Sequence, residues 1–344
     1  MPDPSALPCL RWQLVRRPNG PVAAADLALV EYRLPELAPD HVRVRNIHLS
    51  LDPTQRIWMT EREQYLPPIE VGQAMRGTTL GVVTESRSER LQPGELVLVG
   101  LAGWETVSDV PAKAASRLRR LPGLPLTAHL SVLGNTGLTA WAGMVKVGQV
   151  KAGDTVVVSA AAGAVGSIAG QIARLRGARV VGIAGGPDKC RWLTEDLGFD
   201  AAIDYRNEDV GRALDRHCPD GIDLDFENVG GTIMDAVYER MNTFGRMVLC
   251  GLISSYQDEG PVAGPRDFSR TLMKRLRIEG FIVIDHLPQA KEALGELGAW
   301  VQQGDIRWKD HVVPGIENAV EAMQMLFSGR NEGKLIVGLS TEPA

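Results

Sequence analysis

Cysteine and histidine are scarce in this chain, and neither residue is clustered. The four cysteines, Cys9, Cys190, Cys218 and Cys250, lie far apart and form no CxxC pair. They therefore support neither a disulfide framework nor a thiolate zinc site. The six histidines are scattered and no HExxH motif occurs, so we expect no metal site. Unpaired cysteines suit a reducing compartment, and we predict a cytoplasmic protein.

Charge of one sign and long apolar segments are also lacking. With 42 acidic against 37 basic residues, the formal net charge of -5 gives no attraction toward nucleic acid or anionic membranes. Residues 1–20, MPDPSALPCLRWQLVRRPNG, lack the apolar core of a signal peptide, and the longest nonpolar stretch, residues 156–170, is shorter than a membrane span. We therefore expect a soluble protein whose partners are small molecules, with no nucleic acid and no membrane.

The motifs of two common enzyme classes are missing as well. The chain has no GxSxG turn of serine hydrolases, and none of its five tyrosines is followed four residues later by the lysine of short-chain dehydrogenases. Asp223, Asp225 and Glu227 alternate and could form paired carboxylates. Because such residues share one face near the end of a strand, we interpret them instead as a solvated or hydrogen-bonded strand terminus.

Two kinds of pattern divide the 344 residues, a length typical of two domains. Up to about residue 125, short strand-like segments alternate with Pro and Gly, which predicts a barrel-like β domain. A strand, a helix and a strand at 306–313, 316–327 and 334–339 are expected to return to that domain. The predicted domains are residues 1–128 and 129–304, followed by the returning segment 305–344.

From residue 130 the pattern changes to apolar strands that alternate with amphipathic helices. Six such steps predict an α/β domain with a doubly wound parallel sheet. Each strand is apolar nearly throughout, as expected when helices cover both faces. The expected strands are residues 155–159, 179–184, 201–203, 224–226, 247–250 and 278–283.

The strongest chemical signal is the turn after the predicted strand 155–159. Gly163 and Gly166 lie where a Rossmann turn needs no side chain, so that a pyrophosphate can approach N–H groups at a helix N-terminus. Ala160 replaces the first glycine of the usual GxGxxG. The same glycines could serve only a tight turn and close helix packing, but the strand before them and the amphipathic helix after them favour dinucleotide binding.

The next turn, about twenty residues on, indicates which dinucleotide is bound. NAD sites usually carry Asp or Glu at the end of the second strand, whereas this strand runs into Gly185 and Gly186, with Lys189 close behind. Lys189 can pair with a 2′-phosphate, supported by Arg191 or Arg206. Taken alone, Lys189 could equally be a solvated lysine at a helix start. Because the strand end has no acid, we predict NADP(H).

Eight short segments follow one another along nearly the whole chain. They are LSLDP (49–53), GLTAW (137–141), AAAGAVGS (160–167), LGFD (197–200), FENVGG (226–231), CGLISSY (250–256), EGFIV (279–283) and NEGK (331–334). Together they resemble the zinc-independent medium-chain reductases, in the group of prostaglandin reductase, leukotriene B4 12-hydroxydehydrogenase, alkenal double-bond reductase and curcumin reductase. Two positions depart from that group: Thr54 replaces a usual tyrosine, and Asn135-Thr136 replaces a frequent Met-Pro.

The resemblance implies a GroES-like β-barrel domain, built from both chain ends, around a Rossmann domain, with the active site between them. The residues it implies for NADP(H) are Gly163, Ala164, Val165, Gly166, Lys189, Tyr205, Asn228, Cys250, Gly251, Ile253, Ser254, Ser255, Tyr256, Phe281, Ile282, Val283 and Asn331. Those expected to border the substrate are Thr54, Arg56 and Thr136.

The implied reaction reduces the carbon-carbon double bond of an α,β-unsaturated ketone or aldehyde. NADPH would deliver hydride to the β-carbon, and Tyr256 and the cofactor ribose would stabilise the enolate. Tyr256 could equally pack on the cofactor without a proton role. The alternatives are a zinc-free NADPH:quinone reductase and a non-catalytic NADPH-binding protein. Homodimers are common in the group, so a homodimer is a further expectation.

Overall fold

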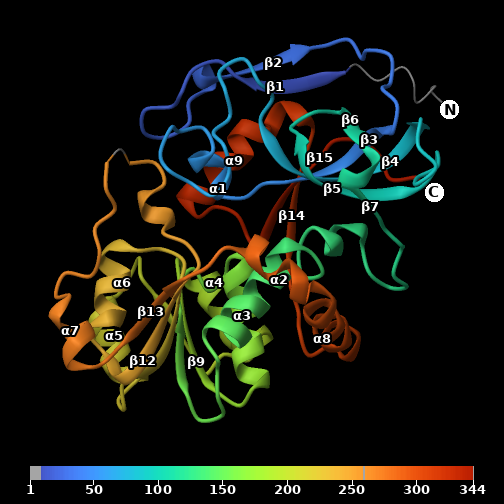
Figure 1. The fold of residues 1–344 in the computed structure, drawn as a ribbon. Helices are drawn as coiled ribbons and strands as arrows, with labels where there is room; N and C mark the ends of the chain where they lie inside the picture. Colours follow the sequence, from blue (N-terminus) through green and yellow to red (C-terminus); the bar gives the residue numbers. More distant parts are fainter. Residues whose placement is uncertain (1–8, 259, 344) are drawn as a thin grey trace.

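The computed structural model describes residues 9–258 and 260–343, which form one domain around a mostly antiparallel sheet and one around a parallel sheet (Figure 1). Residues 1–8, the start of the segment without an apolar core, lie outside the described residues. Across the described ranges, no helix has both the length and the apolar character that crossing a bilayer requires.

The first domain combines strands from both ends of the chain. They are β1 (Leu10–Leu14), β2 (Leu27–Glu31), β3 (His41–Ser50), β4 (Arg76–Ser86), β5 (Leu96–Gly103), β6 (Val107–Pro111), β7 (Ala115–Arg117), β14 (Asp310–Pro314) and β15 (Lys334–Gly338), with helices α1 (Thr54–Ile57) and α9 (Ala319–Ser328). The main sheet has the order β14-β15-β3-β4-β5-β7, with β6 also on β3, while β1 and β2 pair separately. Because β15 pairs antiparallel with β3, strands from both ends of the chain belong to the same sheet.

The second domain is the predicted doubly wound sheet. Its elements are α2 (Asn135–Trp141), β8 (Thr155–Val158), α3 (Ala164–Leu175), β9 (Arg179–Ala184), α4 (Pro187–Arg191), β10 (Ala201–Asp204), α5 (Val210–His217), β11 (Ile222–Glu227), α6 (Gly231–Tyr238), β12 (Met241–Leu249), α7 (Ser269–Met273), β13 (Arg277–Gly280) and α8 (Ala290–Gln303). The strands run parallel in the order β10-β9-β8-β11-β12-β13. This confirms the fold class. The predicted strand 278–283 ends early, at Gly280, and a 3-10 helix covers residues 283–289.

The apolar side chains of the strands pack against helices on both faces of the parallel sheet. In β8, Val156 and Val158 belong to the core that contains α2, α3 and α8, whereas Val157 packs toward α5 and α6 on the other face (Figure 1). Successive side chains of a strand point to opposite faces, so a doubly covered strand is apolar throughout. On α3, a Cβ at Gly170 would lie 2.0 Å from Cζ of Phe199, which shows how closely this helix packs.

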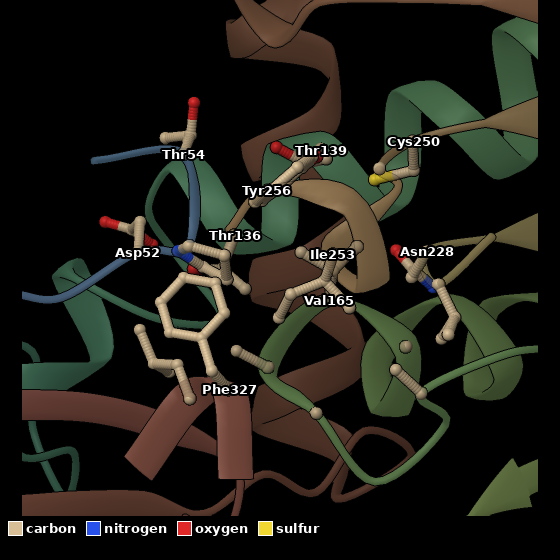
Figure 2. Close-up of a pocket in the computed structure, with 18 of the residues that line it drawn as sticks. Asp52, Thr54, Thr136, Thr139, Val165, Asn228, Cys250, Ile253, Tyr256 and Phe327 are labelled. Atoms are coloured by element: carbon tan, nitrogen blue, oxygen red, sulfur yellow. The ribbon is translucent and has the colours of Figure 1, made fainter. Parts of the chain in front are cut away.

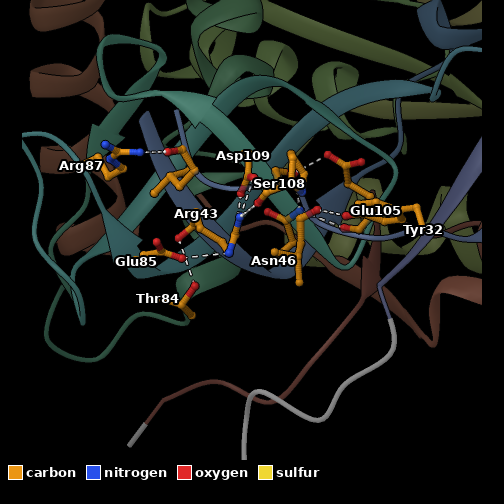
Figure 3. A network of polar contacts seen from close by, with 12 residues as sticks. Tyr32, Arg43, Asn46, Thr84, Glu85, Arg87, Glu105, Ser108 and Asp109 are labelled. Carbon is orange, nitrogen blue, oxygen red and sulfur yellow. Dashed lines mark hydrogen bonds and ion pairs between the residues drawn. The ribbon is translucent and has the colours of Figure 1, made fainter. Parts of the chain in front are cut away.

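Arg43 ties β3 to two of its neighbouring strands, β6 and β4 (Figure 3). Its Nε and Nη2 donate to the two carboxylate oxygens of Asp109 on β6 at 2.8 and 2.9 Å. Its Nη1 donates to Oε2 of Glu85 on β4 at 2.8 Å. Bidentate contacts of this kind stabilise the pairing of the strands and also constrain its geometry. They therefore help to set the register of β3 and the position of residues 51–57, which follow this strand.

The interpretation of Asp223, Asp225 and Glu227 as a solvated or hydrogen-bonded strand terminus is wrong for Asp225. Asp225 and Glu227 have 0% exposure, because β11 lies inside the sheet between β8 and β12. Glu227 Oε1 accepts hydrogen bonds from Ser159 Oγ and from the N–H of Gly230. Neither carboxylate oxygen of Asp225 has a partner among the described residues. Burial, with the nearby Glu227 carboxylate, therefore raises the pKa of Asp225 well above its ordinary value.

Asp225→Asn is expected to stabilise the fold at neutral and alkaline pH. Because the folded pKa is raised, the contribution of Asp225 is most favourable below the unfolded pKa and is lost as pH rises through the folded pKa. An amide does not ionise, so we expect a gain of about 1–3 kcal/mol in the free energy of unfolding at about pH 8 and little gain at about pH 4. Urea unfolding at both pH values measures this, with exposed Asp220→Asn as the control. Equal effects at the two pH values would contradict it.

Candidate active site

A cavity of about 720 Å³ lies between the two domains and is lined by both (Figure 2). The ends of β8, β11 and β12 meet there, at the carboxyl edge of the parallel sheet, where ligands of such sheets bind. Its lining residues fall within segments 51–57, 63–65, 136–139, 160–166, 184–189, 228–233, 250–256, 281–283 and 326–335, together with Tyr205.

The turn between β8 and α3 presents backbone to this cavity. A Cβ on Gly166 would lie 2.5 Å from the carbonyl oxygen of Ala160, and a Cβ on Gly163 would lie 3.0 Å from the same atom. Ala160 itself adopts a left-handed φ of 46° at the position where glycine is usual. The 12-residue helix α3 begins at Ala164, which lines the cavity, so its unpaired N–H groups are available to an anion. The pyrophosphate of a dinucleotide fits such a turn.

Two cations lie near the end of the cavity where a 2′-phosphate is expected. Lys189 Nζ donates to the carbonyl oxygen of Gly329 at 2.8 Å, and Arg206 Nη2 donates to that of Ser328 at 3.1 Å. Burial lowers the pKa of Lys189, and the charge of Arg206 lowers it further. Both partners are neutral carbonyls, so a bound phosphate would gain two charge-assisted hydrogen bonds and relieve the repulsion between the cations.

Asp204 shapes this end of the cavity, although no sequence motif pointed to it. Its Oδ1 accepts the backbone N–H of Gly186 at 2.8 Å and that of Arg206 at 3.1 Å. One carboxylate at the end of β10 thereby orders both turns that face the 2′-phosphate position. Arg191, the other cation considered beside Lys189, bonds instead to its neighbour on α4, Asp188, and is not part of the cavity wall.

The other end of the cavity is bordered by two fixed amides. Asn228 Nδ2 donates to the carbonyl oxygen of Ser159 at 2.7 Å, and the Asn228 backbone N–H donates to Ser159 Oγ at 2.7 Å. Asn331 Nδ2 donates to the carbonyl oxygen of Gly333 at 3.0 Å. Each amide is thus held in one orientation beside the space that a nicotinamide would occupy.

Tyr256 brings a protonated phenol to the same end. It follows a one-turn helix, Ile253–Ser255, in the loop after β12. Its hydroxyl oxygen accepts the backbone N–H of Leu252 at 3.1 Å, so its own proton is not used in that bond. Burial raises the pKa of Tyr256 to about 12, and the hydroxyl stays neutral at physiological pH. The arrangement can donate a hydrogen bond to an oxygen that becomes negative.

Two of the predicted residues are not part of the cavity wall. Arg56 is 1% exposed, and its Nη2 donates to the carbonyl oxygens of Pro18 and Gly20 at 3.2 and 2.8 Å. It therefore holds the turn 18–20 against α1 and does not border the substrate space. The Ser255 hydroxyl donates to the carbonyl oxygen of Leu252 at 2.8 Å, within its own turn. All the other predicted site residues line the cavity, and their contacts with cofactor or substrate stay predictions.

Several lining residues were not among the predicted site residues. Lys334 is 2% exposed, and its Nζ donates to Asp52 Oδ1 at 2.6 Å and to the carbonyl oxygen of Leu51 at 2.7 Å. Phe327 of α9 and Tyr65 add aromatic surface. These residues come from segments far apart in the chain, so only the folded structure brings them together.

Comparisons with known proteins agree with this geometry. Two family models match, the N-terminal domain of oxidoreductase at residues 10–118 and zinc-binding dehydrogenase at residues 164–300. The chain is 39% identical over 334 residues to the NADPH-dependent curcumin reductase of Escherichia coli (strain K12), covering 95% of this chain and 96% of that protein. It is 39% identical over 316 residues to the NADP(+)-dependent 2-alkenal reductase of Nicotiana tabacum, covering 91% of each. The crystal structure of CurA in complex with NADPH from Vibrio vulnificus has a TM-score of 0.91 and 38% identity, covering 97% of this chain and 100% of that one.

The zinc in the description of the second family model does not fit the residues of this chain. Within the ranges 9–258 and 260–343, no three His, Cys, Asp or Glu side chains lie together in a way that could hold a metal ion. The four cysteines are separate from one another and unpaired. A structural or catalytic zinc site needs three or four such donors.

Lys189→Ala is expected to weaken NADPH binding by about 10- to 100-fold, because a hydrogen bond to a charged group contributes about 1.5–3 kcal/mol. NADH has no 2′-phosphate, so its affinity should change by less than about threefold. Isothermal titration with both dinucleotides measures the two effects. Lys113→Ala, an exposed lysine in the first domain, is the control. Equal weakening of both dinucleotides would show that Lys189 does not bind the phosphate.

Proposed function

We propose that this chain, which belongs to the curcumin, alkenal and prostaglandin reductase group of the medium-chain dehydrogenase/reductase superfamily, is an NADPH-dependent reductase. The bond that it reduces is the carbon-carbon double bond of α,β-unsaturated ketones or aldehydes. One observation carries the proposal. A single cavity connects the turn that contains Gly163 and Gly166, and Lys189, to the buried phenol of Tyr256, whose proton is not used in its bond with Leu252.

The residues of this chain bind and orient the cofactor. NADPH, when bound, supplies the hydride that the β-carbon of the substrate accepts. The turn 163–166 binds the pyrophosphate, and Lys189 with Tyr205 binds the 2′-phosphate. Asn228 and Asn331 border the nicotinamide together with the loop after β12. These roles follow from the positions of the residues along one continuous cavity.

Tyr256 stabilises the charge that develops on the substrate. When the β-carbon accepts hydride, the electron pair of the double bond moves toward the carbonyl, and the oxygen becomes that of an enolate. The Tyr256 hydroxyl donates to this oxygen, with a ribose hydroxyl of the cofactor as a second donor. A positioned donor in a site shielded from water is effective because it needs no reorganisation during the reaction. Thr54 and Thr136 border the substrate beside it.

The oligomeric state and the compartment of the protein are two further parts of the proposal. We propose a homodimer through β13, which lies at the edge of the parallel sheet and pairs on one side with β12. In the segment that leads into β13, Phe268, Leu272 and Met273 are 63%, 70% and 63% exposed. A second copy of the chain could pair with this open edge and cover these side chains. The four unpaired cysteines support a reducing compartment, the cytoplasm.

The purified protein is expected to oxidise NADPH in the presence of 2-alkenals and long-chain enones and to release the saturated carbonyl compound. Loss of NADPH absorbance and the mass of the product measure this, with quinones assayed in parallel. Turnover of quinones alone would identify a quinone reductase, and tight NADPH binding without turnover of any substrate would indicate a non-catalytic protein.

Tyr256→Phe should lower kcat by about 10²- to 10³-fold while NADPH affinity stays within about threefold. Tyr238→Phe, a buried tyrosine outside the cavity wall, is the control.

Analytical ultracentrifugation is expected to show a dimer at micromolar concentration. Leu272→Asp places a charge in the apolar surface beside β13 and should shift the protein toward the monomer. Leu101→Asp, a 53% exposed leucine of the first domain, is the control and should leave the dimer intact. A monomer in the unmodified protein would contradict the proposed interface.

A further inference from the structure

The segment 61–66 lies along the cavity and has no part in the function described so far. It connects α1 to β4, and three of its residues, Glu63, Gln64 and Tyr65, line the cavity. The guanidinium of Arg62 donates to the carbonyl oxygen of Asp258, which belongs to the loop after β12 in the second domain. The segment is therefore fixed across the cavity, from the first domain to the loop that carries Tyr256.

Tyr65 and Thr54 form a pair of hydroxyls on this wall. The Tyr65 oxygen lies 2.5 Å from Oγ1 of Thr54, in a hydrogen bond that either residue could donate. Two hydroxyls joined by one hydrogen bond use one proton and keep the other, so the pair offers a free O–H in either arrangement. Thr54, the first residue of α1, lines the cavity. Tyr65 is 41% exposed, so the pair connects the cavity wall with water.

Tyr256 differs from Tyr65 in the exposure of its hydroxyl to water. Its hydroxyl is buried and engaged by the N–H of Leu252, so a proton lost from it has no direct replacement from solvent. Burial chiefly raises the pKa of Tyr256, and both phenols line the same cavity. The same cavity thus holds one buried hydroxyl and one hydroxyl pair in contact with water.

The pairing also accounts for an unusual residue. Thr54 stands where the resembling reductases usually carry a tyrosine, and the shorter side chain leaves room at that point of the wall. Tyr65 reaches this place from the neighbouring segment and contacts the Thr54 hydroxyl. Position 54 has no phenol, but Tyr65 places one at the same part of the cavity wall.

We propose that the Tyr65–Thr54 hydroxyl pair donates the proton that the α-carbon accepts, while Tyr256 holds the enolate oxygen. This step rests on the proposed double-bond reduction. The electron pair of the enolate forms the new α-carbon–hydrogen bond, the O–H bond of Tyr65 breaks, and the resulting phenolate takes a proton from water. The sum is one hydride from NADPH and one proton from water added across the double bond.

A donor fixed on one wall has a stereochemical consequence. Tyr256 holds the enolate oxygen, and the proton then arrives from the side of Tyr65, on one face of the α-carbon. A substrate with a methyl group on the α-carbon should therefore yield one enantiomer in excess. Protonation by water that entered the cavity freely would reach both faces.

The test uses an open-chain enone with an α-methyl group and follows NADPH oxidation and the enantiomer ratio of the product, by chiral chromatography. Tyr65→Phe keeps the ring and removes the proton, so we expect the ratio to approach 1:1 and kcat to fall by about tenfold or more, since general acid catalysis contributes roughly 10²- to 10⁴-fold. Hydride transfer in a single turnover should change by less than about threefold. Thr54→Val should reduce the ratio as well, and Thr54→Ser should preserve it.

Tyr205→Phe is the matched control. Tyr205 is 42% exposed and also lines the cavity, but at the 2′-phosphate end, so its loss should leave the enantiomer ratio of the wild-type product unchanged whatever happens to NADPH affinity. An unchanged ratio in Tyr65→Phe, or a racemic product from the wild-type protein, would overturn the proposed proton donor while leaving double-bond reduction intact. Failure of the wild-type protein to oxidise NADPH with any enone would overturn both proposals.

Discussion

The site depends on one backbone contact, made where the end of the chain crosses from the second domain to the first. The N–H of Gly333 donates to the carbonyl oxygen of Ala162 at 3.3 Å, and Gly333 forms an isolated bridge with Gly163. Gly333 has φ of 59°, and a Cβ there would lie 2.1 Å from the carbonyl oxygen of Lys309, so the position requires glycine. The phosphate turn and the returning strand β15 are thereby held together by main-chain atoms, and the two walls of the cavity keep a defined separation.

Charge is distributed unevenly along the cavity that this contact creates. Lys189 and Arg206 place positive charge at one end, where their side chains donate to carbonyl oxygens and the Asp204 carboxylate accepts the backbone N–H of Arg206. At the substrate end, Asp52 is paired with Lys334, and the wall also contains Glu63 beside the hydroxyls of Thr54 and Tyr65. In the proposed function, charge binds the phosphorylated cofactor, whereas hydrogen-bond donors meet the carbonyl compound. This division suits hydride transfer from NADPH, in which negative charge develops on the substrate oxygen while the nicotinamide becomes positively charged.

Local patterns predicted the features that depend on neighbouring residues. The parallel strands were recognisable because a strand covered on both faces is apolar throughout, and the turn at Gly163 and Gly166 because a strand-turn-helix unit needs glycine at those places. NADP(H) was predictable from the missing acid at the end of β9, and Lys189, which follows that end, lines the cavity. The errors concern Asp225 and Arg56, whose surroundings are set by distant segments. An alternating carboxylate on a strand looks solvated until the strand is known to be central, and an arginine beside a site motif looks functional until its carbonyl partners are known.

The sequence by itself determined the fold class, through the alternation of apolar strands and amphipathic helices, and the preference for NADP(H), through the glycines and charges between residues 155 and 189. The tertiary structure alone decided which hydroxyls share the cavity, since Thr54, Tyr65 and Tyr256 come from three separate segments. It also decided that Lys334 neutralises Asp52 across 282 residues of chain. Contacts of this kind have no local pattern, because the distance between two side chains follows from how sheets and domains pack and not from how far apart the residues lie in the sequence.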